Sequence, residues 1–101
     1  MKFRKRKFAV IYMIHNTKVD KYYVGKSVDC FNRWQSHLQQ LFYKKHHNKD
    51  LQKDFDEGSY RDLKFEILKV STKKKINELE KYYIEKLNNS GKVLYNKTKG
   101  G

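Results

Sequence analysis

Residues 8–15 constrain the fold most, because their side chains are mostly β-branched, aromatic or aliphatic on both alternating faces. Such a pattern is typical of a central strand that other layers cover on each side. Residues 16–20 then supply polar turn residues, and residues 21–26 follow as a second strand that ends near Gly25. The two segments predict a β-hairpin whose loop is longer than two residues.

Two helices are predicted after the hairpin. Residues 30–44 place apolar side chains on one stripe at about 100° per residue, and Ser27 or Asp29 can cap the first turn. Residues 49–57 form a shorter helix, for which Asn48 is the expected N-cap. The first of these is therefore an amphipathic helix that packs on the core.

A third strand and a long helix complete the pattern. Residues 64–70 have the alternating pattern of the strand. Thr72 is expected to cap a helix over residues 72–88, and residues 93–95 follow as a short extended tail. At 101 residues the chain suits one domain, because a second would be too short to bury its own core. The order of elements predicts an α+β fold in which helices pack on a small antiparallel sheet.

The charge of the chain points to a polyanionic partner. Lysine and arginine number 24 against 11 acidic residues, and the net charge of +13 exceeds the roughly 2 to 8 units that solubility requires of a small domain. Nucleic acid presents closely spaced phosphates, which such a charge binds with salt-sensitive affinity. The competing interpretation is compositional, since Lys, Asn, Tyr and Phe are all abundant while Pro is absent.

Residues 1–7 are interpreted as a basic arm that contacts phosphate, with a nuclear-localisation signal as the competing motif. Two adjacent lysines near the end of the first predicted helix add a second basic site. The residues expected to bind DNA are Lys2, Arg4, Lys5, Arg6, Lys7, Lys44 and Lys45.

The single cysteine, Cys30, excludes an internal disulfide and favours a reducing, intracellular location, whether cytoplasmic, phage, bacterial or organellar. No CxxC pair or HExxH run offers the ligand spacing of a zinc site. The apolar stretches are far shorter than the roughly 20 residues that cross a bilayer, so no membrane partner is expected.

Glu80 breaks the pattern of the last predicted helix. With Ile76 at the centre of the apolar face, a period of about 3.6 residues places Glu80 inside that face, whereas Glu78 and Glu85 fall on the solvated side. A buried carboxylate requires a cation, a metal ion or several hydrogen-bond donors. Helical geometry leaves two alternatives open, a metal site and a structural ion pair with a lysine or arginine.

Other polar residues also lie beside the predicted core. Arg33 and His37 are four residues apart along one edge of the first helix, where a guanidinium and an imidazole suit phosphate binding, although such pairs also occur on ordinary exposed helices. Tyr12 and Tyr23 fall close together across the hairpin, near Lys26. Tyrosines on strands usually fill cores, yet a phenol can accept a proton where a nearby cation lowers its pKa.

Five ordered elements resemble the GIY-YIG nuclease family over nearly the whole chain. Val10-Ile11-Tyr12 stands where the family has Gly-Ile-Tyr, and Tyr23-Val24-Gly25 stands where it has Tyr-Ile-Gly. The replacement of the first glycine by Val10 should favour the strand and leave the chemistry largely untouched. The other three elements are Arg33 with His37, the segment from Glu80 to Ile84, and Tyr95-Asn96 followed by Gly100-Gly101.

The resemblance implies a small three-stranded antiparallel sheet flanked by helices, with residues 8–101 as the catalytic domain after the arm. It also implies a DNA endonuclease that hydrolyses phosphodiester bonds with one divalent cation, Mg²⁺ or Mn²⁺, in an oxygen-rich shell. Glu80 would be the metal ligand, and Arg33 would stabilise the charge on the phosphate in the transition state.

The resemblance further implies roles for the remaining polar residues. Tyr12 or Tyr23 would deprotonate the attacking water, with Tyr12 preferred and Lys26 assisting. His37 would relay or supply a proton, and Asn96 would support the site by hydrogen bonding. The expected catalytic residues are Tyr12, Tyr23, Lys26, Arg33, His37, Glu80 and Asn96.

Two other functions stay open on the sequence. The first is a basic nucleic-acid-binding module that has the nuclease fold but little activity. The second is a structural RNA-binding protein, for which the aromatic signature of RNA-recognition domains is missing. Nicking or double-strand cleavage, the recognition sequence, and action as a monomer or a transient dimer on DNA are equally open.

Overall fold

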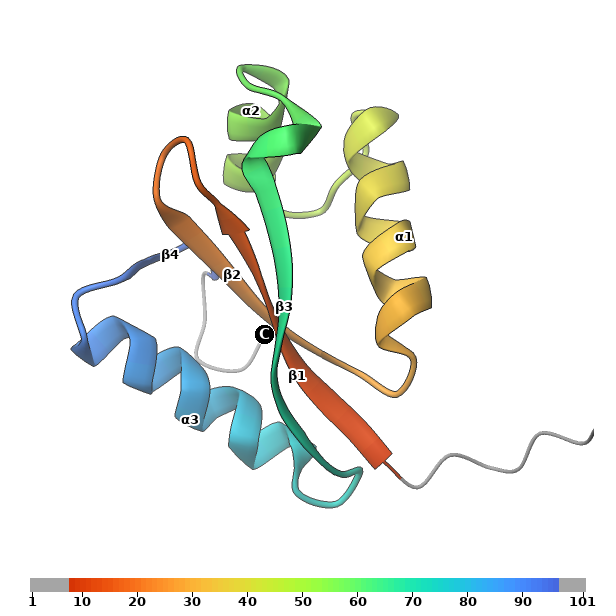
Figure 1. Ribbon diagram of the computed structural model, residues 1–101, viewed down its shortest axis with the longest axis vertical. Coiled ribbons are helices and arrows are strands. Elements are labelled where there is room, and N and C mark those ends of the chain that lie inside the picture. The colour runs from red at the N-terminus through yellow and green to blue at the C-terminus, as the bar shows by residue number, and fades with distance from the viewer. Residues whose placement is uncertain (1–7, 97–101) are drawn as a thin grey trace, which may run out of the picture.

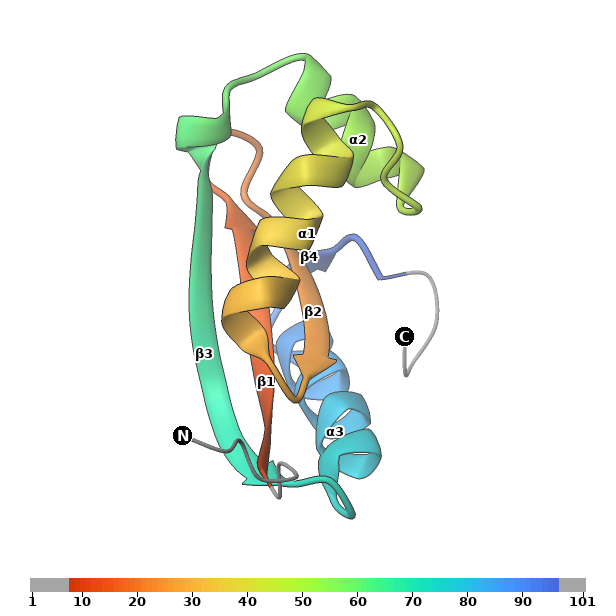
Figure 2. The same ribbon diagram turned by 90° about the vertical axis from the view of Figure 1, so that its right-hand side faces the viewer.

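The computed structural model describes residues 8–96, which form a sheet with helices on both of its faces (Figures 1 and 2). The elements are β1 (Phe8–Asn16), β2 (Lys21–Ser27), α1 (Cys30–Phe42), α2 (Lys49–Asp56), a short 3-10 helix (Tyr60–Asp62), β3 (Leu63–Thr72), α3 (Ile76–Asn89) and β4 (Val93–Leu94). No helix in this range combines the length and the apolar character that crossing a membrane requires.

The sheet has four strands in the order β3-β1-β2-β4. β1 is central, as its pattern predicts, and pairs antiparallel with β2 and β3. β4 pairs parallel with β2, through Lys21 beside Val93 and Tyr22 beside Leu94. The prediction of three antiparallel strands was therefore wrong in detail, because two residues of extended tail carry no alternation that a sequence pattern could detect. The α+β class is confirmed.

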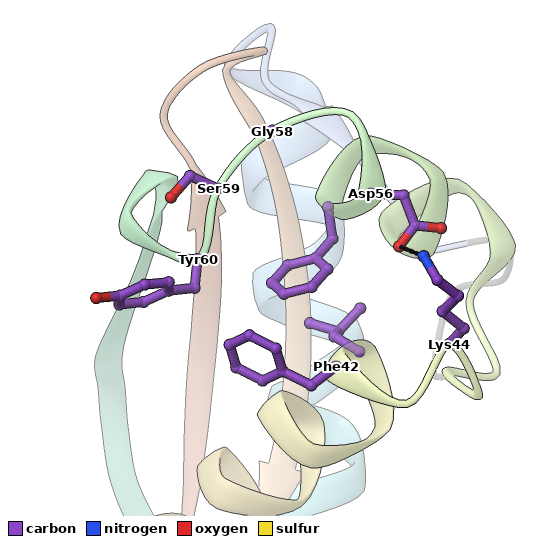
Figure 3. Close-up of a pocket in the computed structure, with 8 residues that line it drawn as sticks. Phe42, Lys44, Asp56, Gly58, Ser59 and Tyr60 are labelled. Carbon is purple, nitrogen blue, oxygen red and sulfur yellow. Dashed lines mark hydrogen bonds and ion pairs between the residues drawn. The ribbon is translucent and has the colours of Figure 1, made fainter.

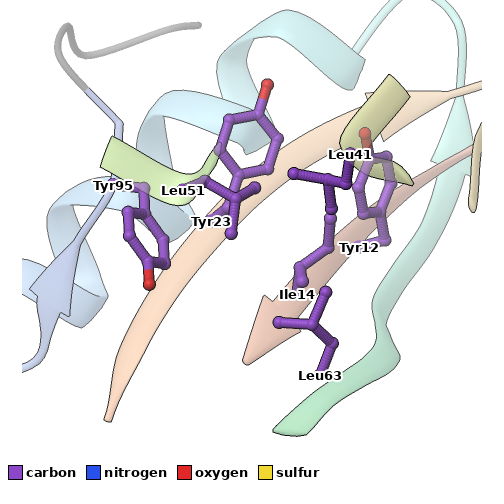
Figure 4. Close-up of a cluster of buried hydrophobic side chains, with 7 residues drawn as sticks. All are labelled: Tyr12, Ile14, Tyr23, Leu41, Leu51, Leu63 and Tyr95. Carbon is purple, nitrogen blue, oxygen red and sulfur yellow. The ribbon is translucent and has the colours of Figure 1, made fainter. Parts of the chain in front are cut away.

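The alternation of β1 divides the core into two halves. Tyr12 and Ile14 face α1 and α2 and join one cluster of buried side chains (Figure 4). Ala9 and Ile11 face the other way and pack against α3. In Figure 1, α1 accordingly lies to the right of the sheet and α3 to its left. A strand buried on both faces therefore holds together two layers of helices.

The helix starts follow the predicted capping residues in two cases of three. The carboxylate of Asp29 accepts a hydrogen bond from the Asn32 backbone N–H at 3.3 Å, and Asn48 caps α2 through the Leu51 N–H at 3.0 Å. The expectation for Thr72 was wrong. Thr72 is the last residue of β3, where it pairs with Phe8, and α3 begins only at Ile76 without a side-chain cap.

Candidate active site

A cleft of about 250 Å³ opens beside β2, near the point where β4 stops pairing with it. Its walls come from both helical layers and from the first two strands. The side chains and backbone that line it belong to Tyr12, Tyr23, Gly25, Lys26, Arg33, His37, His47 and Glu80. The structure thus brings together six of the seven residues predicted to be catalytic, and the seventh, Asn96, contacts the same strand.

Glu80 is 3% exposed, as the periodicity of α3 predicts, while Glu78 and Glu85 are exposed. One carboxylate oxygen, Oε1, accepts a hydrogen bond from Lys26 Nζ at 3.1 Å. Lys26 was expected to assist a tyrosine, and its recorded contact is with Glu80 instead. The pair explains how a carboxylate can be buried on an apolar helix face.

The donor set around Glu80 fits a hard cation that keeps most of its water. Within residues 8–96, Lys26 is the one hydrogen-bond partner of this carboxylate, so the second oxygen is open to the cleft. The same range contains no group of three histidine, cysteine or acidic side chains arranged to hold a metal. Mg²⁺ is commonly bound by one or two carboxylates together with water and substrate phosphate, which matches a single open carboxylate.

A chain of hydrogen bonds runs from Tyr12 into the core. The Tyr12 hydroxyl lies 2.6 Å from His37 Nε2, and His37 Nδ1 lies 2.7 Å from His46 Nε2. The backbone N–H of Asn48 then donates to His46 Nδ1 at 3.0 Å. All four residues are buried, with exposed fractions between 0% and 7%.

The Asn48 N–H fixes the direction of the whole chain. Burial lowers the pKa of His37 to about 3 and that of His46 to about 4, so both rings are neutral near pH 7. A neutral His46 that accepts at Nδ1 carries its proton on Nε2 and donates it to His37 Nδ1. His37 in turn carries its proton on Nε2 and donates to the Tyr12 oxygen.

Tyr12 is therefore a hydrogen-bond acceptor toward His37, and its own hydroxyl proton is available to the cleft. Burial raises the pKa of Tyr12 well above the ordinary value for a phenol, which keeps that proton in place. The ring lies across Gly25 on the neighbouring strand, where any Cβ would overlap the phenol. Gly25 is thus required for the position of Tyr12.

The second tyrosine has its own histidine. The Tyr23 hydroxyl lies 3.3 Å from His47 Nε2, and the His47 ring stacks on His46 with centroids 4.5 Å apart. Figure 4 shows the hydroxyl groups of Tyr12 and Tyr23 on the same side of the apolar cluster. Burial, and after it the Glu80 charge, raises the pKa of Tyr23. Unlike His37, His47 is exposed.

Arg33 lies one turn before His37 on α1 and is exposed at the cleft. Its charge acts on both tyrosines, because it lowers the pKa of Tyr12 and of Tyr23 against the larger effect of burial. Within the described residues the guanidinium has no recorded hydrogen-bond partner. It is therefore available to an anion that enters the cleft.

Asn96 holds the edge of β2 with its side chain. Its amide oxygen accepts from the Val24 N–H at 2.9 Å, and its amide nitrogen donates to the Val24 carbonyl at 2.8 Å. These two bonds extend the contact along β2 to Val24, two residues beyond the last β2–β4 pair at Tyr22. Asn96 thus fixes the strand that carries Tyr23 and Gly25, and it does not itself line the cleft.

Sequence reasoning missed His46 and His47. Neither fits an apolar stripe or a ligand spacing. Each acquires its partner only through tertiary structure, His46 from α1 and His47 from β2. The one available signal was the position of two adjacent histidines directly before the Asn48 cap, in a chain with four histidines in all.

Of the residues predicted to bind DNA, Lys44 and Lys45 do not line this cleft. Lys44 and Lys45 follow α1 and are exposed, and Lys44 forms an ion pair with Asp56 at 3.3 Å. Lys44 lines a separate hollow of about 390 Å³ together with Phe42 and Tyr60 (Figure 3). The predicted arm contacts Lys2, Arg4, Lys5, Arg6 and Lys7 lie outside the described residues.

Two solved structures are similar, one titled as the catalytic domain of the homing endonuclease I-TevI and one as that of the intron endonuclease I-TevI with a glutamate replaced by alanine. The first is 30% identical with a TM-score of 0.78 and coverage of 89% of this chain and 98% of the other. The variant is 29% identical with a TM-score of 0.81 and coverage of 93% and 97%.

No curated protein matches the sequence. Residues 8–96, in contrast, match the family described as the GIY-YIG catalytic domain, and this range includes every residue of the cleft and Asn96. The chain belongs to the GIY-YIG catalytic domain family.

Proposed function

We propose that the protein is a divalent-metal-dependent DNA endonuclease that hydrolyses phosphodiester bonds. The observation that carries the proposal is one cleft in which the buried carboxylate Glu80 lies with the exposed cation Arg33 and with Tyr12 and Tyr23. The proteins of similar structure are themselves titled as catalytic domains of an intron or homing endonuclease. Hydrolysis of a phosphodiester requires a group that binds the phosphate anion and a group that accepts a proton, and the cleft contains candidates for both.

Glu80 is the proposed ligand of the cation, which is Mg²⁺ or Mn²⁺. Bound there, the cation would supply charge stabilisation to a phosphoryl oxygen. Lys26 holds Glu80 in place, because it forms an ion pair with a carboxylate that would otherwise be buried without a partner. Lys26 is thus proposed as the partner of Glu80 rather than of a tyrosine.

Arg33 binds the scissile phosphate and opposes the negative charge that grows on it during attack. A guanidinium suits this role because its planar donors match two phosphate oxygens at once. Its exposure at the cleft, four residues before the buried His37, places it where a phosphate can reach it.

Tyr12 acts as a hydrogen-bond donor toward the substrate, since His37 already donates to its oxygen and its proton is free to point into the cleft. This assignment differs from the preference for Tyr12 as base that accompanied the family resemblance. Tyr23 is then the tyrosine that accepts the proton of the attacking water. His37 orients Tyr12, and Asn96 positions the strand of Tyr23.

DNA is the proposed substrate, bound with help from the net charge of +13. Lys44, Lys45 and the basic residues among positions 2–7 are the proposed phosphate contacts outside the cleft. One cleft makes one nick, so cutting both strands requires two events or a transient dimer. The protein would act inside a cell, where DNA is present and the Cys30 thiol stays reduced.

The competing function is a basic nucleic-acid-binding module without useful activity. Incubation of supercoiled plasmid with the protein and Mg²⁺, against the same mixture with EDTA, separates the two. We expect conversion to nicked or linear DNA that stops in EDTA. Binding of the plasmid without conversion in Mg²⁺ or Mn²⁺ would favour the binding module instead.

A further inference from the structure

The cleft contains two tyrosine–histidine pairs that differ in their access to solvent. The inner pair, Tyr12 with His37, is hydrogen-bonded on its core side to His46, which accepts from the backbone N–H of Asn48. Its tautomers are fixed, so His37 can donate to the phenol but has no lone pair with which to accept the phenolic proton. The inner pair therefore cannot remove a proton from the cleft.

The outer pair, Tyr23 with His47, lacks that restriction. His47 Nε2 lies 3.3 Å from the Tyr23 hydroxyl, and the rest of its ring is exposed. Within residues 8–96 no other hydrogen bond of this imidazole is recorded, so nothing fixes its tautomer. An imidazole in this position can accept a proton at Nε2 and release one to water from Nδ1.

We propose that His47 acts through Tyr23 as a positioning and proton-accepting residue in phosphodiester hydrolysis. The inference rests on the endonuclease function proposed above and deepens it, because it names the group that receives the proton of the nucleophile. His47 accepts the phenolic proton of Tyr23 while Tyr23 accepts a proton from the attacking water. Tyr23 is the group that meets the reacting water, and His47 does not touch it.

The step balances as a hydrolysis. One O–H bond of water breaks, its oxygen forms a bond to phosphorus, and the P–O bond to the leaving oxygen breaks. The water proton goes to the Tyr23 oxygen, and the original Tyr23 proton goes to His47 Nε2. His47 returns one proton to solvent from Nδ1, and the leaving oxygen takes one up from solvent, so one water is consumed.

The neighbours of His47 hold it in place for this role. Its ring stacks on His46 with centroids 4.5 Å apart, meets Tyr23 edge-on at 6.1 Å and lies 6.5 Å from His37. These three are the titratable rings recorded around it within the described chain. Burial, and to a smaller extent the charges of neighbours that include His47, lowers the pKa of His37 and of His46.

The test combines His47→Ala with chemical rescue by imidazole. Single-turnover cleavage of plasmid is measured at saturating protein with Mg²⁺, and DNA affinity is measured separately in EDTA. We expect His47→Ala to slow cleavage by about 10- to 100-fold with unchanged DNA affinity. The loss is smaller than the full contribution of a positioned acid–base group, because His47 acts only through Tyr23. Added imidazole should raise the cleavage rate of His47→Ala at least several-fold and leave the rate of the wild type unchanged.

Two further variants make the test specific. Tyr23→Phe/His47→Ala should show no imidazole rescue, because the rescued group acts through the phenol. His15→Ala is the matched control, since His15 stacks on Tyr22 at 4.1 Å outside the cleft, and it should cut like the wild type. The proposal is overturned if His47→Ala cuts at the wild-type rate, if Tyr23→Phe does so, or if the slowed variant gains nothing from imidazole.

Failure of the endonuclease function itself has a different signature. A wild-type protein that cuts no DNA in Mg²⁺ or Mn²⁺ overturns both proposals before any variant is compared. A wild-type protein that cuts, together with an equally active His47→Ala, overturns only the role of His47.

Discussion

A single backbone N–H, that of Asn48, sets the direction of the hydrogen bonds that join three side chains, those of His46, His37 and Tyr12. It donates to His46 Nδ1, and each neutral ring then donates to the next group until Tyr12 is reached. The same residue caps α2 and donates through its side chain to the Tyr95 carbonyl at 2.8 Å. The orientation of Tyr12 therefore depends on the fold of the loop before α2, well away from Tyr12 in sequence.

The buried histidines predict a loss of stability in mild acid. The pKa values of His37 and His46 in the folded protein are about 3 and about 4, below the unfolded value near 6.5, so the unfolded state binds more protons between these limits. Their contribution to stability is complete above pH 6.5 and is lost as the pH falls toward the folded values. We expect the free energy of unfolding to fall by up to about 1.4 kcal/mol per pH unit for each histidine.

Urea unfolding at pH 7, 6 and 5 measures this dependence in a window where most carboxylates stay ionised. His46→Gln, which removes one of the two titrating groups, should make the decline shallower even if it lowers stability overall. Stability that is constant between pH 7 and pH 5 would mean that the rings are not held neutral in the folded protein.

The elements show which features of the fold the sequence can predict. β1 was predicted as a central strand because both of its faces are apolar. Glu80 was identified because the apolar residues before and after it on the same helix define one face that includes its position. Residues 93–95 were predicted to be extended, but the pairing of β4 with β2 could not be predicted, since β2 lies some 70 residues earlier and two residues give no period. Thr72 was misassigned because strand pairing with Phe8 outweighs its capping preference.

The same distinction, between regular elements and loops or pairings that depend on tertiary structure, holds for the residues of the site. Residues on a regular element, such as Arg33 and His37, could be placed from helical spacing and from resemblance to the family. His46 and His47 lie in a loop, and their partners come from other elements, so only tertiary structure reveals them. The pairing of Lys26 with Glu80 likewise depends on how α3 crosses the sheet.

At the level of elements, Asn96 is predicted to hold β2 at the edge of the sheet. Asn96→Leu removes both hydrogen bonds to Val24 and should cost about 1–3 kcal/mol of stability. Amide hydrogen exchange provides a local readout: the Val24 N–H should exchange faster relative to the amides of β1. An unchanged Val24 exchange rate would contradict the role given to this side chain.

Charge governs the behaviour of the whole molecule on DNA. A net charge of +13 predicts a steep dependence of DNA affinity on salt, because each phosphate that is neutralised releases counterions. Replacing Lys2, Arg4, Lys5, Arg6 and Lys7 with glutamine should reduce the slope of log affinity against log salt by about 0.9 for each phosphate that is no longer neutralised. Lys44→Gln/Lys45→Gln should reduce it by at most about 2 by the same relation.

Fluorescence anisotropy on a labelled duplex, between roughly 50 and 200 mM salt, measures both slopes. Because Lys44 and Lys45 do not line the cleft, Lys44→Gln/Lys45→Gln should keep the wild-type cleavage rate once DNA is saturating. A slope that does not change with the arm substitutions would assign the phosphate contacts to other cations of the chain.

Matched substitutions on one helix test the central claim most directly. Glu80 is buried at the cleft and Glu78 is exposed on the opposite face of α3, so Glu80→Gln and Glu78→Gln remove the same charge from two different environments. Plasmid cleavage in Mg²⁺ is measured for both variants, with circular dichroism to confirm folding. Glu80→Gln should lose at least about 100-fold in rate while Glu78→Gln cuts like the wild type. A folded Glu80→Gln variant that cuts as fast as Glu78→Gln would contradict the role of this carboxylate in holding the cation.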